Sequence, residues 1–504
     1  MSGFLIENGV LLKYRGDDGT AVVPDGVTAI GDKAFYGCKN LKEVTVPSGV
    51  TSIGKMAFAG CYSLGAINIP DGVTHIGEDA FLHTEYELDP LNWTGGAMYA
   101  GRCLVRVQKD VTGKYTVKKG TFFIVDGAFS SCRIKEVRIP DSVTSIGRGA
   151  FRHCLSLTTV CLPDGITKIE NETFYGCGVI KELKIPDGVT SIGDSAFGGC
   201  SSLEELHIPD GVVSIGQGAF KNCTALTSVN IPAGVHNIEK RTFSGCDTLP
   251  SVVLPDGVRN IGKEAFFKCS ALENVHIPNS VKSIEREAFR YCEALRSVTV
   301  SEGVAIIGKN AFYGCKKLIE IVIPSSVKVI GNGAFFLCGE LKSVTLSEGV
   351  DDIEDNAFRR CGALKRTSIP SSVRHIGNRA FKDCDDLEEF EMGIEQNELL
   401  EYNSNHRLIY IVTKGWISGF EQGVIAKNEL SVFEEFIRSH VLEIRTFVMN
   451  DRAFIEFVTK RRLLSPENAE SLMEKSTDIE CKAMLLNYVG SERGDGEPFD
   501  KFKL

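Results

Sequence analysis

A phenylalanine returns every 23 residues over most of the chain, and this period constrains the fold more than any other feature. It occurs at Phe35, Phe58 and Phe81, continues through Phe129 and Phe151, and then recurs from 174 to 381. A fixed period of 20 to 50 residues is typical of a solenoid, in which each repeat buries its apolar side chains only against its neighbours. The 504 residues therefore need not divide into several globular domains.

One repeat is expected to form a short strand followed by a turn and a second inward-facing stretch. In the segment 203–208, Leu206 and Ile208 alternate with polar residues, which predicts a strand whose apolar side chains point into the core. Pro209 then ends the strand because proline has no N–H for the ladder, and the Asp-Gly pair at 210–211 favours a turn. The pattern predicts a mainly β fold with short parallel strands stacked from repeat to repeat.

The cysteines follow the same period as the phenylalanines. Fourteen of the seventeen cysteines lie three residues after a repeat phenylalanine, from Cys38 to Cys384. Equivalent residues of stacked repeats are about 4.8 Å apart, and parallel Cβ vectors keep that separation, which is wider than the ~3.8 Å that a disulfide prefers. We expect a ladder of reduced, buried thiols that act as compact apolar fillers; a disulfide zipper is the alternative.

The repeat also resembles a known family. The motif Cys-x-x-Leu-x-x-Leu-x-Ile-Pro-x-x-Val-x-x-Ile-Gly-x-x-Ala-Phe, from Cys200 to Phe220, is similar to the BspA-like subclass of leucine-rich repeats. The resemblance covers residues 24–393 and implies a right-handed leucine-rich-repeat solenoid of fifteen repeats of 23 residues. The segment 93–99, Trp-Thr-Gly-Gly-Ala-Met-Tyr, resembles an insert common in that family. Members are often bacterial or protist surface proteins implicated in adhesion, so the resemblance implies adhesion as one candidate function.

Departures from the period divide the chain into segments. Between Phe81 and Phe129 the spacing is 48 residues, which predicts an inserted hairpin whose strands, over 98–107 and 114–117, project from the coil. The predicted segments are a hairpin cap (1–23), the solenoid (24–393, with the insert at 82–118), a connector (394–427), a helical C-terminal unit (428–490) and a disordered tail (491–504). Within the connector, the segment 408–412, Leu-Ile-Tyr-Ile-Val, is expected to form a final strand.

The helical unit is predicted from capping residues and a 3.6-residue apolar period. Ser431 and Glu434 form a capping-box pattern. Ser465 followed by proline predicts an N-cap for a helix that ends near Lys475, and a last helix is expected from Asp478 to Tyr488. One helical face collects apolar side chains, namely Phe433, Phe436, Ile437, Val441 and Ile444. We interpret this unit as a structural cap on the solenoid; a docking module is the alternative.

No arrangement of residues predicts catalysis. The chain has no Cys-x-x-Cys, no His-Glu-x-x-His and no phosphate loop, so we expect a protein that is not an enzyme and needs no cofactor or metal. Cys161 lies outside the thiol ladder with no histidine partner, which favours a bystander thiol. His207 and His276 are three repeats apart, roughly 14 Å by strand spacing, which is too far to share a metal.

The candidate function is a non-enzymatic protein-interaction scaffold that binds a macromolecular partner through the outward side chains of its strands. A net charge of −10 argues against nucleic acid as the partner. The chain has no apolar run long enough to span a membrane, and we expect a monomer. The candidate binding residues are Arg138, Lys184, His207, Asn230, His276, Thr299 and Thr345.

The alternative function is an exported surface adhesin. The tripeptide Arg15-Gly16-Asp17, expected at the tip of the N-terminal hairpin, is a candidate adhesion loop, and a second copy occurs at 493–495. The first residues of the chain lack the basic and apolar regions of a signal peptide. We therefore expect a cytoplasmic location, with leaderless export as the alternative.

Overall fold

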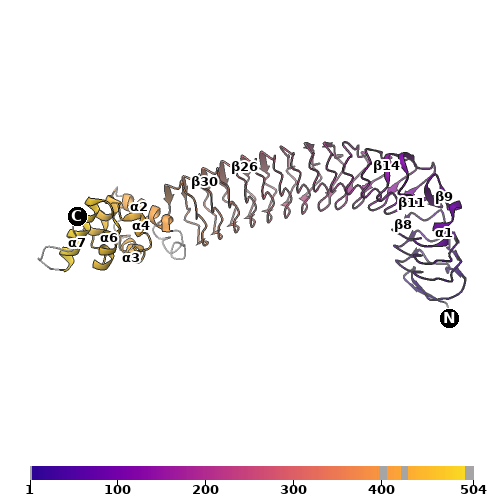
Figure 1. The fold of residues 1–504 in the computed structure, drawn as a ribbon, viewed down its shortest axis with the longest axis horizontal. Coiled ribbons are helices and arrows are strands. Elements are labelled where there is room, and N and C mark those ends of the chain that lie inside the picture. The colour runs from indigo at the N-terminus through magenta and orange to yellow at the C-terminus, as the bar shows by residue number, and fades with distance from the viewer. Residues whose placement is uncertain (1–2, 394–395, 397–405, 422–429, 494–504) are drawn as a thin grey trace. The chain divides into compact units, whose positions relative to one another are not determined.

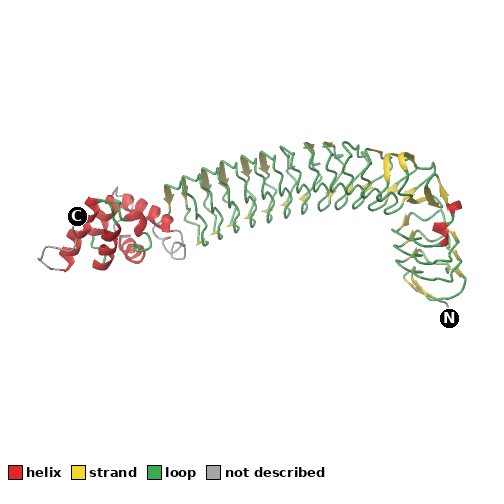
Figure 2. Cartoon of the chain, in the orientation of Figure 1, coloured by secondary structure: helices red, strands yellow, loops and turns green. Residues whose placement is uncertain are grey.

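Most repeats fold into a coil with two short strands, and equivalent strands of successive coils pair in parallel in the computed structural model. The structure describes residues 3–393, 396, 406–421 and 430–493. The chain divides into two units, residues 1–274 and 275–504, and the repeats of each follow one another as successive coils (Figure 1). Helices gather after the repeats of the second unit (Figure 2). The prediction of a leucine-rich-repeat β-solenoid with a small helical C-terminal region is confirmed.

The first unit begins with an antiparallel hairpin and continues with two series of parallel strands. The hairpin consists of β1 (Phe4–Glu7) and β2 (Val10–Tyr14). The first series contains β3 (Thr20–Val22), β5 (Glu43–Thr45), β7 (Ala66–Asn68), β12 (Thr112–Thr116), β14 (Arg133–Arg138), β16 (Thr159–Cys161), β19 (Glu205–Leu206) and β21 (Ser228–Val229). The second contains β4 (Ala29–Ile30), β6 (Ser52–Ile53), β8 (His75–Ile76), β13 (Phe123–Ile124), β15 (Ser145–Ile146), β17 (Lys168–Ile169), β18 (Ser191–Ile192), β20 (Ser214–Ile215), β22 (Asn237–Ile238) and β23 (Asn260–Ile261).

The second unit contains the same two series in a more regular form. The first series runs in the order β24 (Asn274–Ile277), β26 (Ser297–Val300), β28 (Glu320–Ile323), β30 (Ser343–Leu346), β32 (Arg366–Ser368) and β34 (Glu389–Glu391). The second runs in the order β25 (Ser283–Ile284), β27 (Ile306–Ile307), β29 (Val329–Ile330), β31 (Asp352–Ile353) and β33 (His375–Ile376). We call the surface formed by the outward side chains of the first series, in either unit, the strand face.

The repeat phenylalanines form a stacked column inside each unit. Neighbouring rings lie nearly parallel, as for Phe312, whose centroid is 5.2 Å from that of Phe289 and 5.3 Å from that of Phe335. Where the insert interrupts the period, Tyr86 covers Phe81 at 5.6 Å and Tyr115 meets the edge of Phe129 at 5.6 Å. Tyrosines therefore close the column on both sides of the interruption. Each ring buries a large apolar area against the rings before and after it, and we expect the column to be the main stabilising element of the coils.

The thiols form the predicted second column beside the rings. Every described cysteine is free, and the ladder cysteines after Cys38 are buried. Most of these thiols donate to the carbonyl of a phenylalanine in the preceding coil, as Cys177 does to Phe151 at 3.0 Å and Cys315 to Phe289 at 3.3 Å. After the insert, Cys132 donates instead to the carbonyl of Val107 at 3.5 Å. The predicted burial of the ladder thiols is confirmed from Cys61 to Cys384, and their reduced state stays a prediction. The thiol also links adjacent coils by a hydrogen bond, which the sequence pattern did not predict.

The strands of the insert pair differently from the prediction. It contains α1 (Glu85–Leu88), the 3-10 turn η1 (Pro90–Asn92) and the strands β9 (Trp93–Thr94), β10 (Ala97–Ala100) and β11 (Cys103–Val107). β10 and β11 form an antiparallel pair, but β11 also pairs in parallel with β13, and β12 pairs with β14 rather than with the hairpin. The two predicted strands therefore belong to different sheets and do not project from the coil together, because each finds its ladder partner in the next repeat.

The second unit ends in helices. These are α2 (His406–Glu421), α3 (Leu430–His440), α4 (Arg445–Val448), α5 (Arg452–Lys460), α6 (Pro466–Lys475) and α7 (Ile479–Arg493). The predicted strand over 408–412 is wrong, because this segment lies inside α2, whose side chains Leu408, Val412 and Trp416 are buried at a spacing of four residues. α2 packs on β34, and the indole N–H of Trp416 donates to the carbonyl of Met392 at 3.0 Å.

The helix boundaries agree with the capping patterns in part. The predicted apolar face of α3 and the segment after it is buried, and Ser465 caps α6 by accepting a hydrogen bond from the N–H of Asn468 at 3.2 Å. Ser431 does not act as the N-cap, since α3 already includes Leu430. α7 continues through Gly490 to Arg493, beyond the predicted end at Tyr488. Most of the predicted disordered tail, residues 494–504, lies outside the described residues.

Candidate functional site

The strand face of the second unit exposes the three candidate residues predicted there. His276, Thr299 and Thr345 lie on β24, β26 and β30, and all three are exposed because the strands alternate exposed and buried side chains. None of the three side chains makes a hydrogen bond or an ion pair with another described residue. Val322 of β28 lies directly beside Thr345 in the parallel ladder and is 57% exposed. The face therefore carries an apolar side chain within a row of polar ones.

The four candidates of the first unit differ from one another. Lys184 and His207 are exposed and make no hydrogen bond or ion pair within the described chain. Arg138 pairs with Glu136 at 3.1 Å on the same strand. The side chain of Asn230 accepts a hydrogen bond from the N–H of Ile208 at 2.8 Å and donates to the carbonyl of the same residue at 2.7 Å. Asn230 thus replaces a missing backbone pair, and the scaffold itself uses its side chain.

Polar side chains at the turns are used by the scaffold itself. The carboxylate of Asp32 accepts a hydrogen bond from the N–H of Lys55 in the next coil at 2.7 Å, and that of Asp194 accepts one from Gln217 at 2.8 Å. Glu348 accepts hydrogen bonds from the N–H groups of Ser371 and Ser372, both at 3.1 Å. These bonds hold the pKa of the Glu348 carboxyl below its usual value. Turn carboxylates therefore stabilise the stacking of coils, in contrast to His276, Thr299 and Thr345 on the strand face.

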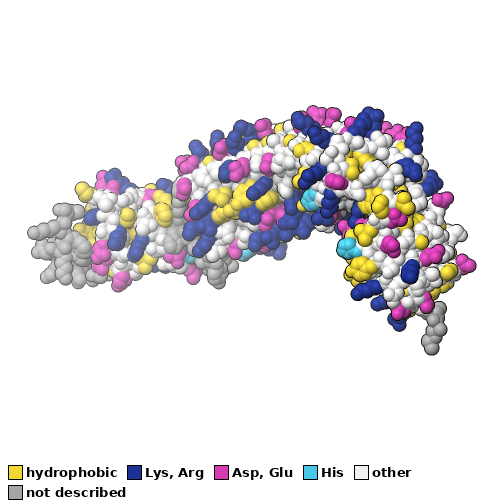
Figure 3. Space-filling view, turned by 45° about the vertical axis from the view of Figure 1, so that its right-hand side comes forward, with side chains coloured by type: hydrophobic (Ala, Val, Ile, Leu, Met, Phe, Trp, Pro, Cys, Tyr) yellow, Lys and Arg dark blue, Asp and Glu magenta, His cyan; other side chains and the backbone are white. Residues whose placement is uncertain are grey.

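A shallow hollow lies on the strand face near the end of the repeats. Its volume is 270 Å³, and its polar lining comes from three neighbouring strands, β30, β32 and β34: Ser343, Thr345, Arg366, Ser368, Glu389 and Glu391. Acidic and basic side chains are both spread over the molecular surface seen in Figure 3. A mixed surface of this kind suits a protein partner better than a ligand of one charge.

The candidate adhesion loop is not at the tip of a hairpin. The turn of the β1–β2 hairpin is formed by Asn8 and Gly9, which have φ values of 51° and 77°, as expected for an Asn-Gly hairpin turn. Arg15, Gly16 and Asp17 instead connect β2 to β3. Arg15 and Asp17 are exposed. The carboxylate of Asp17 accepts a hydrogen bond at 2.7 Å from the side chain of Asn40 in the next repeat. The second tripeptide begins at Arg493 and otherwise lies outside the described residues.

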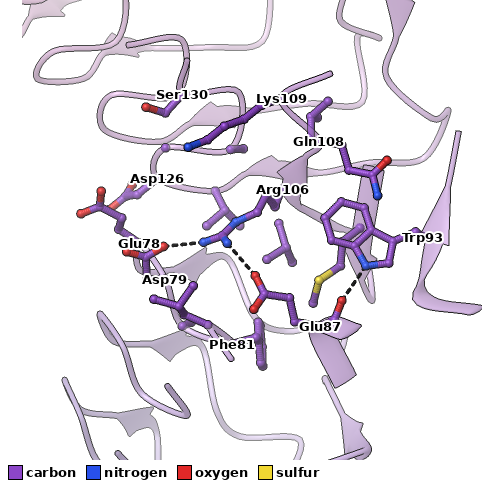
Figure 4. Close-up of a pocket in the computed structure, with 18 of the residues that line it drawn as sticks. Glu78, Asp79, Phe81, Glu87, Trp93, Arg106, Gln108, Lys109, Asp126 and Ser130 are labelled. Atoms are coloured by element: carbon purple, nitrogen blue, oxygen red, sulfur yellow. Dashed lines mark hydrogen bonds and ion pairs between the residues drawn. The ribbon is translucent and has the colours of Figure 1, made fainter. Parts of the chain in front are cut away.

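A second, larger hollow lies where the insert interrupts the repeats. Its volume is 1060 Å³, and Arg106 of β11 stands at its centre (Figure 4). The guanidinium of Arg106 pairs with Asp79 and, at 2.6 Å, with Glu87. The indole N–H of Trp93 donates to the carbonyl of Glu87 at 2.6 Å. These groups come from a turn, a helix and two strands, so the polar cluster forms only where the insert brings these elements together. The candidate residues predicted from the sequence did not include it.

Three further features were sought in the described part of the chain: a metal site, a membrane span and a partner for Cys161. No group of three or more His, Cys, Asp and Glu side chains there is placed to hold a metal ion. None of the described helices has the length and apolar character needed to cross a bilayer. Cys161 is exposed on β16 as predicted, and no hydrogen-bond partner accompanies its thiol.

The repeats match a family model over most of the chain. The BspA type leucine rich repeat region model matches residues 19–89, 122–249, 214–316 and 282–405. The chain belongs to the BspA-type leucine-rich-repeat family. Repeats of this family typically mediate protein interactions, and the solenoid is typically non-enzymatic. The family model leaves out residues 90–121, so the greater part of the insert is additional to the repeat.

Solved structures of bacterial leucine-rich-repeat proteins are similar to this BspA-type chain. One from Bacteroides ovatus is 29% identical with a TM-score of 0.49, covering 79% of this chain and 94% of its own. One from Eubacterium ventriosum is 26% identical with a TM-score of 0.35, covering 60% and 88%. A leucine rich cell surface protein from Faecalibacterium prausnitzii is 27% identical with a TM-score of 0.31, covering 79% and 94%. No curated protein matches the chain.

Proposed function

We propose that this chain is a non-enzymatic scaffold that binds a partner protein through its strand face. The observation that supports this proposal is that the polar side chains of the turns and those of the strand face differ in their hydrogen bonding. Polar side chains at the turns bond to the next coil, whereas His276, Thr299 and Thr345 are exposed and bond to nothing in the described chain. Side chains that the fold does not use, repeated on a rigid array, are free to determine what the array binds.

The chemistry of this face fits a protein. Val322 is exposed among threonine, serine and charged side chains, an arrangement that resembles an apolar anchor with a polar rim. Neighbouring strands contribute both Arg366 and Glu391, so a partner with one uniform charge would meet repulsion on part of the face.

A charge-introducing double variant tests the strand face. The intact chain and its Val322→Glu/Thr345→Glu variant would be used to capture partners from cells of the source organism, with Lys317→Glu, an exposed turn residue, as matched control. We expect a partner that is retained by the control and bound at least tenfold more weakly by the double variant, since each factor of ten corresponds to about 1.4 kcal/mol. Equal capture by both variants would refute the strand face as the binding surface.

We also propose that the protein is cytoplasmic and monomeric, and both its location and its oligomeric state can be measured. Antibody labelling of intact cells should be negative, and light scattering of the purified chain should give the mass of one chain. Surface labelling would instead favour the adhesin alternative. In that case Asp17→Glu, which keeps the charge but lengthens the side chain, should abolish cell attachment to immobilised protein; the scaffold proposal expects no change.

A further inference from the structure

The insert exposes a ridge of apolar side chains that the fold holds in place. Leu88 is 72% exposed and Leu91 is 89% exposed, and Leu91 is the most exposed large hydrophobic side chain among the described residues. Pro90 lies between them and is also exposed. We call these three residues the Leu88 ridge. Single exposed leucines are common, but two within four residues form a local apolar patch of the kind that partners cover.

Hydrogen bonds fix the backbone on which the ridge stands. Thr84 caps α1 by accepting from the N–H of Glu87 at 3.0 Å, and Asp89 accepts from the N–H of Leu91 at 2.9 Å. The side chain of Asn92 donates to the carbonyl of Tyr86 at 2.8 Å, and the N–H of Tyr86 donates to the carbonyl of Leu64 in the preceding repeat at 2.6 Å. The ridge is therefore a preorganised feature, and a partner would lose little free energy in ordering it.

Two hollows meet at Leu88, and acidic side chains predominate in both. The first is the 1060 Å³ hollow around Arg106; its lining includes five carboxylates (Glu78, Asp79, Glu87, Asp110 and Asp126) and two cations (Arg106 and Lys109). The second has a volume of 790 Å³, and its lining includes three carboxylates (Glu43, Glu85 and Asp89) and one lysine (Lys42). Leu88 borders both, so an apolar side chain separates two surfaces of the same charge.

The carboxylates of the first hollow are only partly neutralised from within. Arg106 pairs with Asp79 and Glu87, and Glu78 pairs at 2.6 Å with Lys55, which lies outside the lining. Asp110 has no ion-pair partner in the described chain, and desolvation by burial raises the pKa of Asp126. A positive group entering this hollow would relieve that cost, whereas a phosphate or a carboxylate would meet repulsion.

We propose that the Leu88 ridge and its two hollows form a docking surface for a basic protein segment, in which an apolar side chain packs on the ridge and lysine or arginine side chains on either side enter the hollows. The apolar contact supplies affinity, and the flanking charges select the partner and its register. Nucleic acid is disfavoured by the carboxylates. This site is distinct from the strand face of the second unit, and binding at one does not require the other.

Synthetic peptides on an array test the proposal with the intact chain. The probes are nine-residue peptides with lysines at varied distances on both sides of a central leucine, together with counterparts in which glutamate replaces lysine or serine replaces leucine. We expect the intact chain to bind at least one lysine–leucine peptide ten times more tightly than its glutamate or serine counterpart. Binding should weaken as salt is raised, because exposed charges are screened. No binding to any lysine–leucine peptide would overturn the proposal.

Matched variants assign the binding to this surface. Leu88→Ser/Leu91→Ser should weaken the best peptide at least tenfold, while Leu155→Ser, an equally polar change at a leucine that is 67% exposed elsewhere, should leave it unchanged. Asp110→Asn/Glu85→Gln should weaken it severalfold and reduce its dependence on salt. Equal binding by the ridge variant would overturn the proposal, whereas Val322→Glu/Thr345→Glu must leave peptide binding intact. A strand-face failure and a ridge failure can thus be distinguished.

Discussion

Trp416 allows the interpretation of the helices as a structural cap to be tested directly. The side chain is 4% exposed, donates to the carbonyl of Met392 just after β34, and meets the edges of two rings of α3, Phe433 at 6.0 Å and Phe436 at 5.3 Å. It therefore joins the last described strand of the repeats to the helices. If the helices protect the end of the solenoid, loss of this side chain should loosen β34 as well as α2.

The expected cost follows from these contacts. Truncation of a buried tryptophan to alanine typically costs about 3–5 kcal/mol, which includes the lost burial and the cavity. Trp416→Phe keeps most of the ring contact but leaves the buried carbonyl of Met392 without its donor, which should cost about 1–2 kcal/mol. Val432→Ala, at a residue of α3 that is 40% exposed, is a control expected to stay within about 0.5 kcal/mol.

Amide hydrogen exchange locates the effect along the chain. A local loss of about 4 kcal/mol corresponds to roughly 700-fold faster exchange, at 1.4 kcal/mol per factor of ten. We expect peptides from β32 and β34 to lose protection together with α2 in Trp416→Ala, and to do so far less in Trp416→Phe. Unchanged protection of β34 in Trp416→Ala would refute the cap and show that the helices form an independent module.

Three further predictions concern the thiols, the charges and the rings. At pH 8, the exposed thiol of Cys161 should react with a thiol reagent at once, while Cys103 should react far more slowly, because it is buried and burial raises its pKa from 9.0 to about 11; equal rates would contradict this. All seventeen cysteines should react after unfolding without reductant, and a shortfall would reveal disulfides. The hydrogen bond from Arg452 lowers the pKa of Asp478 from 3.8 to about 2, so its stabilisation is complete above pH 3.8 and is lost as the pH falls towards 2; Asp478→Asn should reduce the acid dependence of the melting temperature over that range, and an unaltered dependence would contradict this. Phe312→Ala should lower the free energy of unfolding by about 3–5 kcal/mol in a urea titration, and a loss below about 1.5 kcal/mol would show that the ring column is not the main source of stability.

The core could be predicted from the sequence because every repeat provides the same environment. The rings and thiols recur at a fixed spacing, so the residues that face inward in one coil face inward in all of them. The backbone conformation of the turns could not be predicted in this way. Two residues before Phe35 and Phe289, the left-handed region is occupied by Lys33 and Glu287, with φ values of 57° and 61°. These residue types rarely adopt it. Glycine occupies the equivalent position only at 127, 149, 218 and 333, so the residue type does not mark it consistently. The N–H groups of Lys33 and Glu287 each donate to a carbonyl of the next coil, which favours this conformation.

The strand prediction for the segment 408–412 was wrong because its amino-acid composition favours a strand, whereas the spacing of its buried side chains is that of a helix. Its isoleucines and valine favour a strand, yet Leu408, Val412 and Trp416 repeat at four residues and are all buried in α2. The insert was difficult for another reason. Arg106 reaches Asp79 and Glu87 across 27 and 19 residues, and nothing in their sequence separation indicates that β11 pairs with the next repeat and brings them together.

Residues ten positions after the repeat phenylalanines occupy equivalent places on the strand face, but they do not all have the same role. Some bond to the neighbouring coil and others are exposed without a partner in the described chain, so their position in the sequence alone does not identify a binding residue. Asn68 and Asn230 occupy equivalent positions, and each bonds to both backbone groups of a residue 22 positions earlier. Asparagine there compensates for an unpaired backbone, whereas His207 and Thr299, in the same column, make no hydrogen bond within the described chain. Because an amide side chain can satisfy both the N–H and the carbonyl and a threonine or histidine cannot do so in the same way, replacing Asn230 should first destabilise the coils. Replacing His207 should change binding alone, and it is at such positions that partner specificity can vary without cost to the fold.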